Sequence, residues 1–409
     1  METNQLALRQ RFAGRARRLP QRVRAIVRRL ENLQGGAIAL RLPGEAAMRL
    51  GEGDVVAQWT VDDLAVFDRV IACGDIGLGE SWMAGQWHCD DLAALLSLLA
   101  ANRAQLGAVV HGGGWSLVLH RLWHLARANT RRGARRNIAT HYDLGNDFYR
   151  LWLDPSMTYS AAVFAHPDEP LADAQARKYR RVLDALGAQP GQHILEIGCG
   201  WGGFAEIAAR EYGCHVRGLT LSPRQRDLAQ ARAAAGGWAD RARFELCDYR
   251  DESGRYDHVV SIEMIEAVGE SFWPTYYAQL ARCLAPGGRA VIQAITIDAA
   301  LFPAYRRGTD FIQRYIFPGG MLPTPARVSA DAARAGLAVR SRFDFGRDYA
   351  RTLQRWAHAF NTQQTAVRAI GFDQRFVRMW QFYLAYCEAG FRAGDLDVHH
   401  FCFVHAGAQ

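Results

Sequence analysis

The strongest constraint on the fold is a run of short apolar segments that alternate with helical segments between residues 190 and 297. Helices are expected at 203–212 and 223–235. Five apolar segments are typical of strands: HILEIG (193–198), HVRGLTL (215–221), FELCD (244–248), YDHVVSI (256–262) and RAVIQAI (289–295). Repeated strand–helix–strand order favours a parallel sheet with helices on both faces. We therefore expect the α/β fold class, with a Rossmann-like, mostly parallel sheet.

A glycine-rich loop, EIGCGWGG (196–203), joins the first strand to the next helix. Glycines let a ligand approach the backbone, and a helix amino terminus offers unpaired N–H groups. Gly198, Gly200 and Gly203 also fit the dinucleotide fingerprint, so the loop by itself is compatible with a nicotinamide cofactor. The loop is therefore the first candidate cofactor site.

Acidic residues near this loop favour a different cofactor. A nicotinamide site would need an acid at the end of the second strand, where Thr220, Leu221 and Ser222 stand instead. Glu196 lies within the first strand, and Asp248 follows the third. This order is typical of methyltransferases that use S-adenosylmethionine, which is the cofactor we expect.

Changes in composition divide the chain into two domains. Arginines cluster from Arg131 to Arg136 around Gly133, and the pattern of the sequence changes beyond them. Strands with turns are expected from about 33 to 75, and helices from about 91 to 128. We predict a smaller, mainly helical amino-terminal domain at 1–130, a basic linker at 131–140 and a catalytic domain at 141–409.

Positive charge is concentrated near the amino terminus. The chain has 49 Lys+Arg against 41 Asp+Glu, and residues 1–30 contain nine arginines but only one acid. Apolar residues recur there every three or four positions, which predicts basic amphipathic helices broken near Pro20. Such a face suits an anionic phospholipid surface or nucleic acid; alternatively, it is a solvated helix face.

Membrane spans, secretory signals and metal sites are not expected. The most apolar stretch, Leu92 to Ala100, has nine residues, against the roughly 18 that suggest a span. The eight cysteines include no CxxC pair, which argues against a zinc site. We predict no metal and a cytoplasmic protein.

Sequence motifs from residue 77 to residue 320 point to one family. In order they are GLGESWMAGQW (77–87), HYDLGNDFY (141–149), LDPSMTYS (153–160), LEIGCGWGG (195–203), GLTLSPRQ (218–225), CDYRD (247–251), EMIEAVG (263–269) and YIFPGG (315–320). With these motifs the chain resembles the cyclopropane-fatty-acyl-phospholipid synthase family, which includes the mycolic acid cyclopropane synthases. The resemblance spans about residues 75–405 and implies a class I methyltransferase fold.

This resemblance implies a reaction in which a one-carbon unit passes from S-adenosylmethionine to the cis double bond of an unsaturated acyl chain in a phospholipid. Tyr159, Ser160 and the glycine loop would meet the methionine end of the cofactor. Thr220 and Gln225 would meet the ribose, and Asp248 and Tyr249 the adenine. The full implied set is Tyr159, Ser160, Glu196, Gly198, Cys199, Gly200, Trp201, Gly202, Thr220, Leu221, Gln225, Asp248 and Tyr249.

Ring closure requires a base, and in better-known members of this family the base is a bound bicarbonate ion. Of its five ligands, the matching positions here keep a glutamate, an isoleucine backbone and a tyrosine: Glu266, Ile295 and Tyr349. A cysteine and a histidine are replaced by Ala161 and Gln293. These two replacements make bicarbonate binding doubtful.

Glu263 stands where better-known members have glycine or another small residue. It lies three positions before Glu266, so the two carboxylates would share a face on a helical turn and one pKa would rise. The hypothesis is that Glu263 substitutes for bicarbonate; the alternative is an acid pair that complements a helix dipole. Tyr315 is an aromatic candidate for stabilising a carbocation. The predicted catalytic set is therefore Glu263, Glu266, Gln293, Ile295, Tyr315 and Tyr349.

Three other functions are considered. The same carbocation would also lead to a methylene- or methyl-branched chain, and a non-catalytic lipid-binding protein is a further alternative. Nucleic-acid methylation is not expected, because no motif that presents a flipped base follows the fourth strand. Expected partners are an anionic phospholipid bilayer and an unsaturated phospholipid, with a homodimer possible. The expected location is peripheral, at the inner face of the cell membrane.

Overall fold

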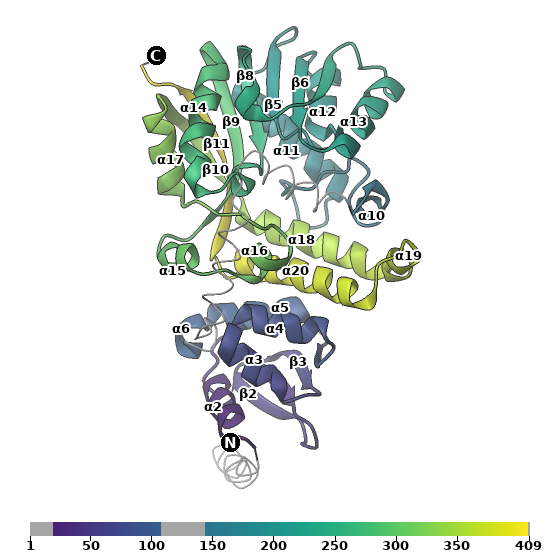
Figure 1. The fold of residues 1–409 in the computed structure, drawn as a ribbon, viewed down its shortest axis with the longest axis vertical. Helices are drawn as coiled ribbons and strands as arrows, with labels where there is room; N and C mark the ends of the chain where they lie inside the picture. The colour runs from purple at the N-terminus through teal and green to yellow at the C-terminus, as the bar shows by residue number, and fades with distance from the viewer. Residues whose placement is uncertain (1–18, 108–143, 408–409) are drawn as a thin grey trace. The chain divides into compact units, whose positions relative to one another are not determined.

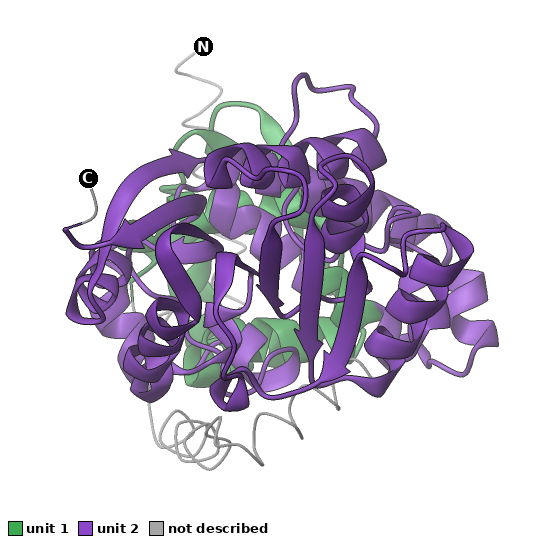
Figure 2. Cartoon of the chain, turned by 90° about the horizontal axis from the view of Figure 1, so that it is seen from above, with its two compact units in different colours: residues 1–119, 378–382 green, residues 120–377, 383–409 purple. Residues whose placement is uncertain are grey.

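The computed structural model describes residues 19–107 and 144–407. The chain divides into two compact units, residues 1–119 with 378–382, and residues 120–377 with 383–409 (Figure 2). The linker predicted at 131–140 lies outside the described residues, so that boundary stays a prediction.

Unit 1 combines five described helices with a small sheet of order β2-β1-β3-β4. Its strands are β1 (Gly36–Arg41), β2 (Met48–Glu52), β3 (Val55–Val61) and β4 (Trp87–Cys89). Its helices are α2 (Gln21–Leu30), α3 (Ala65–Cys73), α4 (Asp75–Met83), α5 (Leu92–Ala101) and α6 (Arg103–Leu106). The strands predicted after residue 33 are present as far as 61.

The prediction of strand structure from 65 to 75 is wrong, because this segment forms α3. Its adjacent residues Val66 and Phe67 are both buried. Successive side chains of a strand point to opposite faces of a sheet, whereas on a helix two neighbours lie on one broad face. The helix therefore buries both side chains against the same core.

Helix α2 confirms the amphipathic pattern over residues 21–30. Pro20 precedes the helix, and four apolar side chains are buried: Val23, Ile26, Val27 and Leu30. Arg28 and Arg29 lie exposed in the last turn, where positive charge complements the helix dipole. The arginines at 9–18 and 121–136 lie outside the described residues.

Unit 2 is built on a seven-stranded sheet of order β10-β11-β9-β8-β5-β6-β7 (Figure 1). The pairs from β7 to β9 are parallel, and β11 pairs antiparallel with both β9 and β10. The strands are β5 (His193–Ile197), β6 (His215–Thr220), β7 (Ala242–Leu246), β8 (Tyr256–Ile262), β9 (Leu284–Ile297), β10 (Leu337–Asp344) and β11 (Leu396–His405). The predicted mostly parallel sheet is confirmed.

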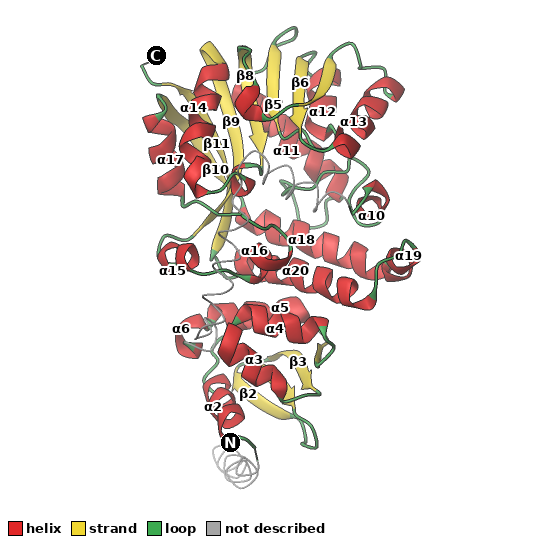
Figure 3. Cartoon of the chain, in the orientation of Figure 1, coloured by secondary structure: helices red, strands yellow, loops and turns green. Residues whose placement is uncertain are grey.

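Helices cover both faces of this sheet, as Figure 3 shows. One apolar core lies between the sheet and α14 with α17, and another between the sheet and α11, α12 and α13. The helices of this part of the chain are α10 (Asn146–Arg150), α11 (Leu171–Leu186), α12 (Gly203–Arg210), α13 (Pro223–Ala235), α14 (Trp273–Cys283), α15 (Phe302–Arg307), α16 (Phe311–Tyr315), α17 (Pro325–Arg334), α18 (Gly346–Thr362), α19 (Gln364–Ala369) and α20 (Gln374–Arg392). Of the helices described, none is both long and apolar enough to span a membrane.

Candidate active site

The glycine loop turns sharply between β5 and α12. Gly198 and Cys199 both donate their backbone N–H to the carbonyl of Leu219 on β6, at 3.0 and 2.9 Å. Gly200 has φ +50°, and a Cβ added there would meet no heavy atom of the described residues within 4 Å. Gly202 differs, because a Cβ there would press on Ala229 and Phe244. Gly200 thus borders open space, as close approach of a ligand requires.

Polar side chains predicted to meet the ribose lie together at the carboxyl end of β6. The Thr220 hydroxyl donates to Gln225 Oε1 at 2.8 Å and accepts the N–H of Ser222 at 3.1 Å. Ser222 is the N-cap of α13, and its hydroxyl accepts the N–H of Gln225. Thr220 and Gln225 are buried, and Leu221 between them is partly buried. The structure therefore confirms that these side chains are neighbours.

Asp248 and Tyr249 follow β7, at the next strand end. Both oxygens of Asp248 accept from the Arg250 guanidinium, at 2.8 and 2.6 Å. The Tyr249 ring meets Tyr276 edge-on, and burial raises the pKa of Tyr249 to about 12. Arg250 was not predicted; its guanidinium and its backbone N–H fix the orientation of Asp248.

Glu196 is buried at the end of β5, and its Oε2 has no hydrogen-bond partner among the described residues. Burial raises its pKa well above the usual value, and the positive charge of Lys178 partly opposes this. A buried oxygen without a partner is costly unless a ligand or water satisfies it. Together with the open space at Gly200, this oxygen fits a polar cofactor such as S-adenosylmethionine.

Aromatic side chains surround Tyr159 on the other side of the loop. Its hydroxyl lies 2.7 Å from that of Tyr383, and its ring contacts Trp152 and Trp356, each with centroids 5.4 Å apart. Trp201 of the glycine loop donates its indole N–H to Asn146 at 2.8 Å. The Tyr149 ring contacts both Tyr159 and Trp201, with centroids 5.5 and 5.0 Å apart, and so connects the Tyr159 segment to the loop.

Glu263, directly after β8, is the centre of a hydrogen-bond network. Its Oε1 accepts from the N–H of Ala161 at 2.8 Å and from Gln293 Nε2 at 2.7 Å. Its Oε2 accepts from the Tyr349 hydroxyl at 2.7 Å. Burial raises the pKa of Glu263, although these donors and the charge of Lys178 partly offset the rise. The carboxylate thus contacts three of the positions that the resemblance assigned to bicarbonate ligands.

Glu266 has a separate environment. It belongs to the short 3-10 helix η3 (Ile265–Ala267), and its Oε1 accepts the N–H of Ile295 at 2.5 Å. Its Oε2 is buried and has no partner among the described residues. Burial, followed by repulsion from Glu263, raises the pKa of Glu266 to about 8. Glu263 lies outside this helix, yet the pair interacts electrostatically as the sequence suggested.

His400 orients the amide of Gln293. The Nε2 atom of His400 lies 2.9 Å from Gln293 Oε1, and burial lowers the pKa of His400 well below its usual value. The imidazole is therefore neutral, and its Nε2–H donates to the Gln293 oxygen. Because the Gln293 oxygen is held by His400, the Gln293 amide nitrogen points toward Glu263, to which it donates at 2.7 Å.

Tyr315 is not part of the Glu263 network. It ends α16 and packs on Phe311, with ring centroids 5.1 Å apart. In the described chain, the donors to Glu263 are Ala161, Gln293 and Tyr349. A role for Tyr315 at the carbocation stays a prediction.

Sequence reasoning missed Lys178, which lies on α11. The side chain is fully buried, and its Nζ donates to Ser160 Oγ at 2.6 Å. Burial lowers the pKa of Lys178 to about 7, opposed by the charges of Glu263, Asp154 and Glu196 in that order. One signal was available: this is the only lysine in an arginine-rich chain, and it stands on the apolar face of its helix.

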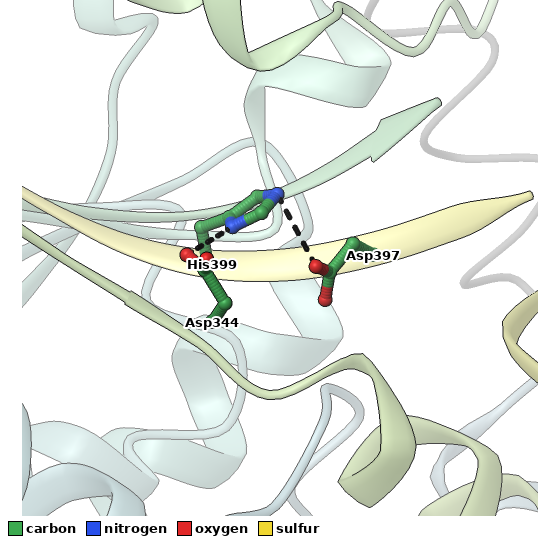
Figure 4. A group of neighbouring side chains, drawn as sticks. All are labelled: Asp344, Asp397 and His399. Atoms are coloured by element: carbon green, nitrogen blue, oxygen red, sulfur yellow. Dashed lines mark hydrogen bonds and ion pairs between the residues drawn. The ribbon is translucent and has the colours of Figure 1, made fainter. Parts of the chain in front are cut away.

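A second cluster with metal-ligand chemistry lies on β10 and β11 (Figure 4). Asp344, Asp397 and His399 face one another there. His399 Nδ1 is 2.7 Å from Asp344 Oδ1, and its Nε2 is 2.7 Å from the Thr296 hydroxyl. Asp397 Oδ1 accepts two backbone N–H groups, from Gly346 and Val398. Both ring nitrogens thus have partners, and the cluster is explained without a metal.

Comparisons with known proteins point to one family. Residues 129–401 match the family model described as mycolic acid cyclopropane synthetase. The chain is 47% identical over 287 residues to the tuberculostearic acid methyltransferase of Mycobacterium tuberculosis, covering 68% of this chain and 67% of that protein. It is 35% identical to the cyclopropane-fatty-acyl-phospholipid synthase of Escherichia coli over 64% of this chain and 66% of that one.

Solved structures agree with this. A cyclopropane synthase of Mycobacterium tuberculosis aligns with a TM-score of 0.62 at 32% identity, covering 66% of this chain and 97% of that one. A mycolic acid cyclopropane synthase solved with SAH and CTAB gives the same TM-score at 31% identity, again over 66% of this chain and 97% of that one.

Proposed function

The chain belongs to the mycolic acid cyclopropane synthetase family, and on that premise we propose that it alkylates the cis double bond of an unsaturated acyl chain carried by a phospholipid. Membership makes it an S-adenosylmethionine-dependent methyltransferase that modifies lipid acyl chains. In the proposed reaction a methyl group adds to one alkene carbon, a carbocation forms, and loss of a proton from the added carbon closes a cyclopropane ring.

Bound S-adenosylmethionine supplies the electrophilic methyl group. The chain's own residues fit the cofactor at three places described above: the open space beside Gly200, the unpartnered oxygen of Glu196 and the Thr220–Gln225 pair. An isolated alkene is a weak nucleophile, so holding it in line and excluding water are the main contributions expected of the site.

The observation that carries the proposal is the buried carboxylate of Glu263. A proton acceptor must be held in place and must have a pKa nearer neutrality than that of a free glutamate. Three donors hold Glu263, burial raises its pKa, and Oε2 accepts only one of the hydrogen bonds, which leaves it a lone pair. We assign the proton-accepting role to Glu263, with Gln293 and Tyr349 orienting it.

Aromatic rings beside this carboxylate fit a carbocation. Tyr349 donates to Glu263 and its ring packs near Trp356, which in turn contacts Tyr159. An aromatic face stabilises a nearby cation by about 0.5–2 kcal/mol. The same rings provide the apolar surface that an acyl chain requires.

A methyl- or methylene-branched product is the second candidate. The 47% identical relative is named as a methyltransferase and not as a cyclopropane synthase. Both products come from the same carbocation: a C–C bond that forms as the proton leaves the added carbon closes the ring, whereas proton loss that forms a C=C bond, after a 1,2-hydride shift for the methylene group, gives a methylene-branched chain or a methyl-branched alkene. A saturated methyl branch would require a separate reductant. The cyclopropane and methylene products have equal mass, so mass alone does not separate them.

The test uses purified protein, labelled S-adenosylmethionine and dioleoyl phospholipid vesicles, followed by NMR of the released fatty acid. Cyclopropane methylene protons support the first candidate, and alkene or branched methyl protons support the second. Cofactor binding without any turnover would leave only a lipid-binding protein and would overturn the proposal.

We also propose that the enzyme docks on the anionic inner face of the cell membrane, since the double bond lies within the bilayer. The exposed arginines of α2 support this proposal. Each basic side chain near an anionic surface contributes roughly 1 kcal/mol, which falls as salt is added.

A further inference from the structure

The chain's only lysine is wholly buried beside the proposed proton acceptor. An ammonium group has three N–H donors, and burial without acceptors disfavours its charged form. Within the described residues, Lys178 has one hydrogen-bond acceptor, the Ser160 hydroxyl at 2.6 Å. Its Nζ also lies 4.2 Å from the centre of the Tyr179 ring. Burial therefore favours the neutral amine of Lys178, whereas the Ser160 hydroxyl and the Tyr179 ring favour the ammonium.

Two adjacent residues connect Lys178 to Glu263. Ser160 accepts from Lys178 through its side chain, and Ala161 donates its N–H to Glu263 Oε1 at 2.8 Å. The carbonyls of the same two residues are fixed as well: Gln175 Nε2 donates to Ser160 O at 2.9 Å, and Gln293 Nε2 to Ala161 O at 3.3 Å. This segment is therefore held from both sides, and the amine and the carboxylate have a defined separation.

Charged and titratable groups face Lys178 from every neighbouring element. Glu263 follows β8, Glu196 lies on β5 and Asp154 lies in the loop before Tyr159, and all three favour the ammonium. His400 on β11 is neutral, and its own pKa is lowered in part by Lys178. Glu263 is the largest electrostatic influence on Lys178, and Lys178 in turn favours the ionised form of Glu263.

We propose that Lys178 and Glu263 titrate as one pair across the Ser160–Ala161 segment, and that the Lys178 ammonium keeps Glu263 ionised and able to accept the proton of the reaction. Lys178 is thus a positioning residue that acts through Glu263. The catalytic consequence rests on the role proposed above for Glu263, but the paired titration does not. Apparent midpoints will belong to the pair rather than to either group.

A single lysine makes the titration directly observable. Protein without a lysine-containing tag is labelled with ε-13C lysine, and the one side-chain resonance is followed from about pH 5 to about pH 10. We expect a midpoint near neutral pH in the wild type, far below the ordinary lysine value of about 10.4. Glu263→Gln removes the facing charge, so the midpoint should fall by roughly one unit.

Glu266→Gln is the matched control, because Glu266 is a nearby buried carboxylate that does not act on Lys178 directly. Removing its charge makes Glu263 easier to ionise, so the lysine midpoint should stay or rise. A wild-type midpoint near 10, or equal midpoints in the wild type and Glu263→Gln, would overturn the proposal. Because the resonance is read without substrate, this result is independent of the proposed activity.

The pH–rate profile tests the catalytic consequence. Lys178→Met removes the charge at similar length, so the acid limb that reports Glu263 should move to higher pH by roughly one unit. Lys178→Arg retains a cation and should keep the wild-type acid limb. Gln175→Met is the control for packing, since it removes a hydrogen bond to Ser160 but no charge. An unmoved acid limb in Lys178→Met would contradict a role through Glu263.

Discussion

Glu263 has a backbone φ of +48°, a left-handed conformation that ordinary side chains adopt at a cost and glycine adopts freely. The carboxylate is nonetheless held there by Ala161, Gln293 and Tyr349. A strained residue persists only where its surroundings fix it, which is frequent at functional sites. A glycine at this position would therefore adopt the same backbone conformation without that cost.

Glu263→Gln is expected to lower the rate by about 10²–10⁴-fold, the usual contribution of a positioned base. Wild-type activity should not change when dissolved carbon dioxide is removed. Glu263→Gly removes the carboxylate and relieves the backbone strain, which leaves space for a bicarbonate ion. Added bicarbonate should therefore partly restore the activity of this variant. Rates measured with and without bicarbonate check this, and a wild type that loses activity without bicarbonate would refute the assignment.

Gly200→Val should abolish S-adenosylmethionine binding, because the new side chain would occupy the open space where a ligand approaches. Since Gly200 has φ +50°, some loss of stability is also expected. Gly191→Val is the matched control: Gly191 has φ +82° and equally open surroundings, but it lies before β5, away from the loop. Calorimetry should show cofactor binding by the control variant, and binding by Gly200→Val would exclude this site.

The buried acid Glu266 should make stability depend on pH. Its pKa is raised to about 8 in the folded protein, above its unfolded value. Its stabilising contribution is thus complete below about pH 4 and is lost as pH rises through about 8. Glu266→Gln mimics the protonated acid, so its Tm should match the wild type at low pH and exceed it near pH 9. Thermal unfolding at both pH values measures the difference, and an unchanged gap would contradict the raised pKa.

At the scale of elements, the parallel strands were predictable because each is a short apolar run between two loops. Strands β10 and β11 were not, since β10 is largely exposed and carries arginines, and β11 contains consecutive histidines. Strand β11 depends on its pairing with β9, and β10 on its pairing with β11, rather than on their own hydrophobic patterns.

The family resemblance, rather than position alone, assigned Thr220, Gln225 and Asp248 to the cofactor, and that assignment stays a prediction. The fold places Thr220 at the end of β6, Gln225 in the first turn of α13 and Asp248 just after β7, so all three lie near the carboxyl ends of parallel strands. Lys178 and His400 were missed because each reaches the site from a distant element, α11 or β11. Arg250 lies two residues from Asp248, but only the folded geometry shows that it pairs with it.

Helix α2 should bind anionic vesicles through its exposed arginines. Replacing the exposed Arg22 and Arg28 and the partly exposed Arg24 with Gln should weaken binding, and added salt should weaken binding by the wild type. Arg22 also loses an exposed ion pair with Asp68, which contributes little to stability. Arg29 is left unchanged because it donates to the carbonyl of Leu106. Vesicle sedimentation at increasing salt measures the effect.

The control for charge removes three exposed arginines of unit 2, at positions where the described structure shows no ion pair: Arg255, Arg347 and Arg375. Net charge then falls equally in both variants. Equal loss of binding by both would mean that overall charge, and not the α2 face, attracts the vesicle.

On the scale of the whole molecule, the family model matches residues 129–401, whereas residues 19–107, which form most of the described part of unit 1, lie before that range. The shared chemistry therefore belongs to unit 2. Unit 1 has its own buried core of helices and strands, as a compact unit must. The proposed docking of unit 1 on a membrane is accordingly tested through α2 and not through the catalytic residues.

Because the single lysine is buried, chemical modification of its side chain can be used to measure local unfolding of the protein. An amine-acylating reagent reaches Lys178 only when the core around α11 opens. The extent of acylation on the peptide containing Lys178 therefore measures how often this core opens, and mass spectrometry reads it without any engineered probe. A ligand that closes the site should slow this modification in proportion to its occupancy.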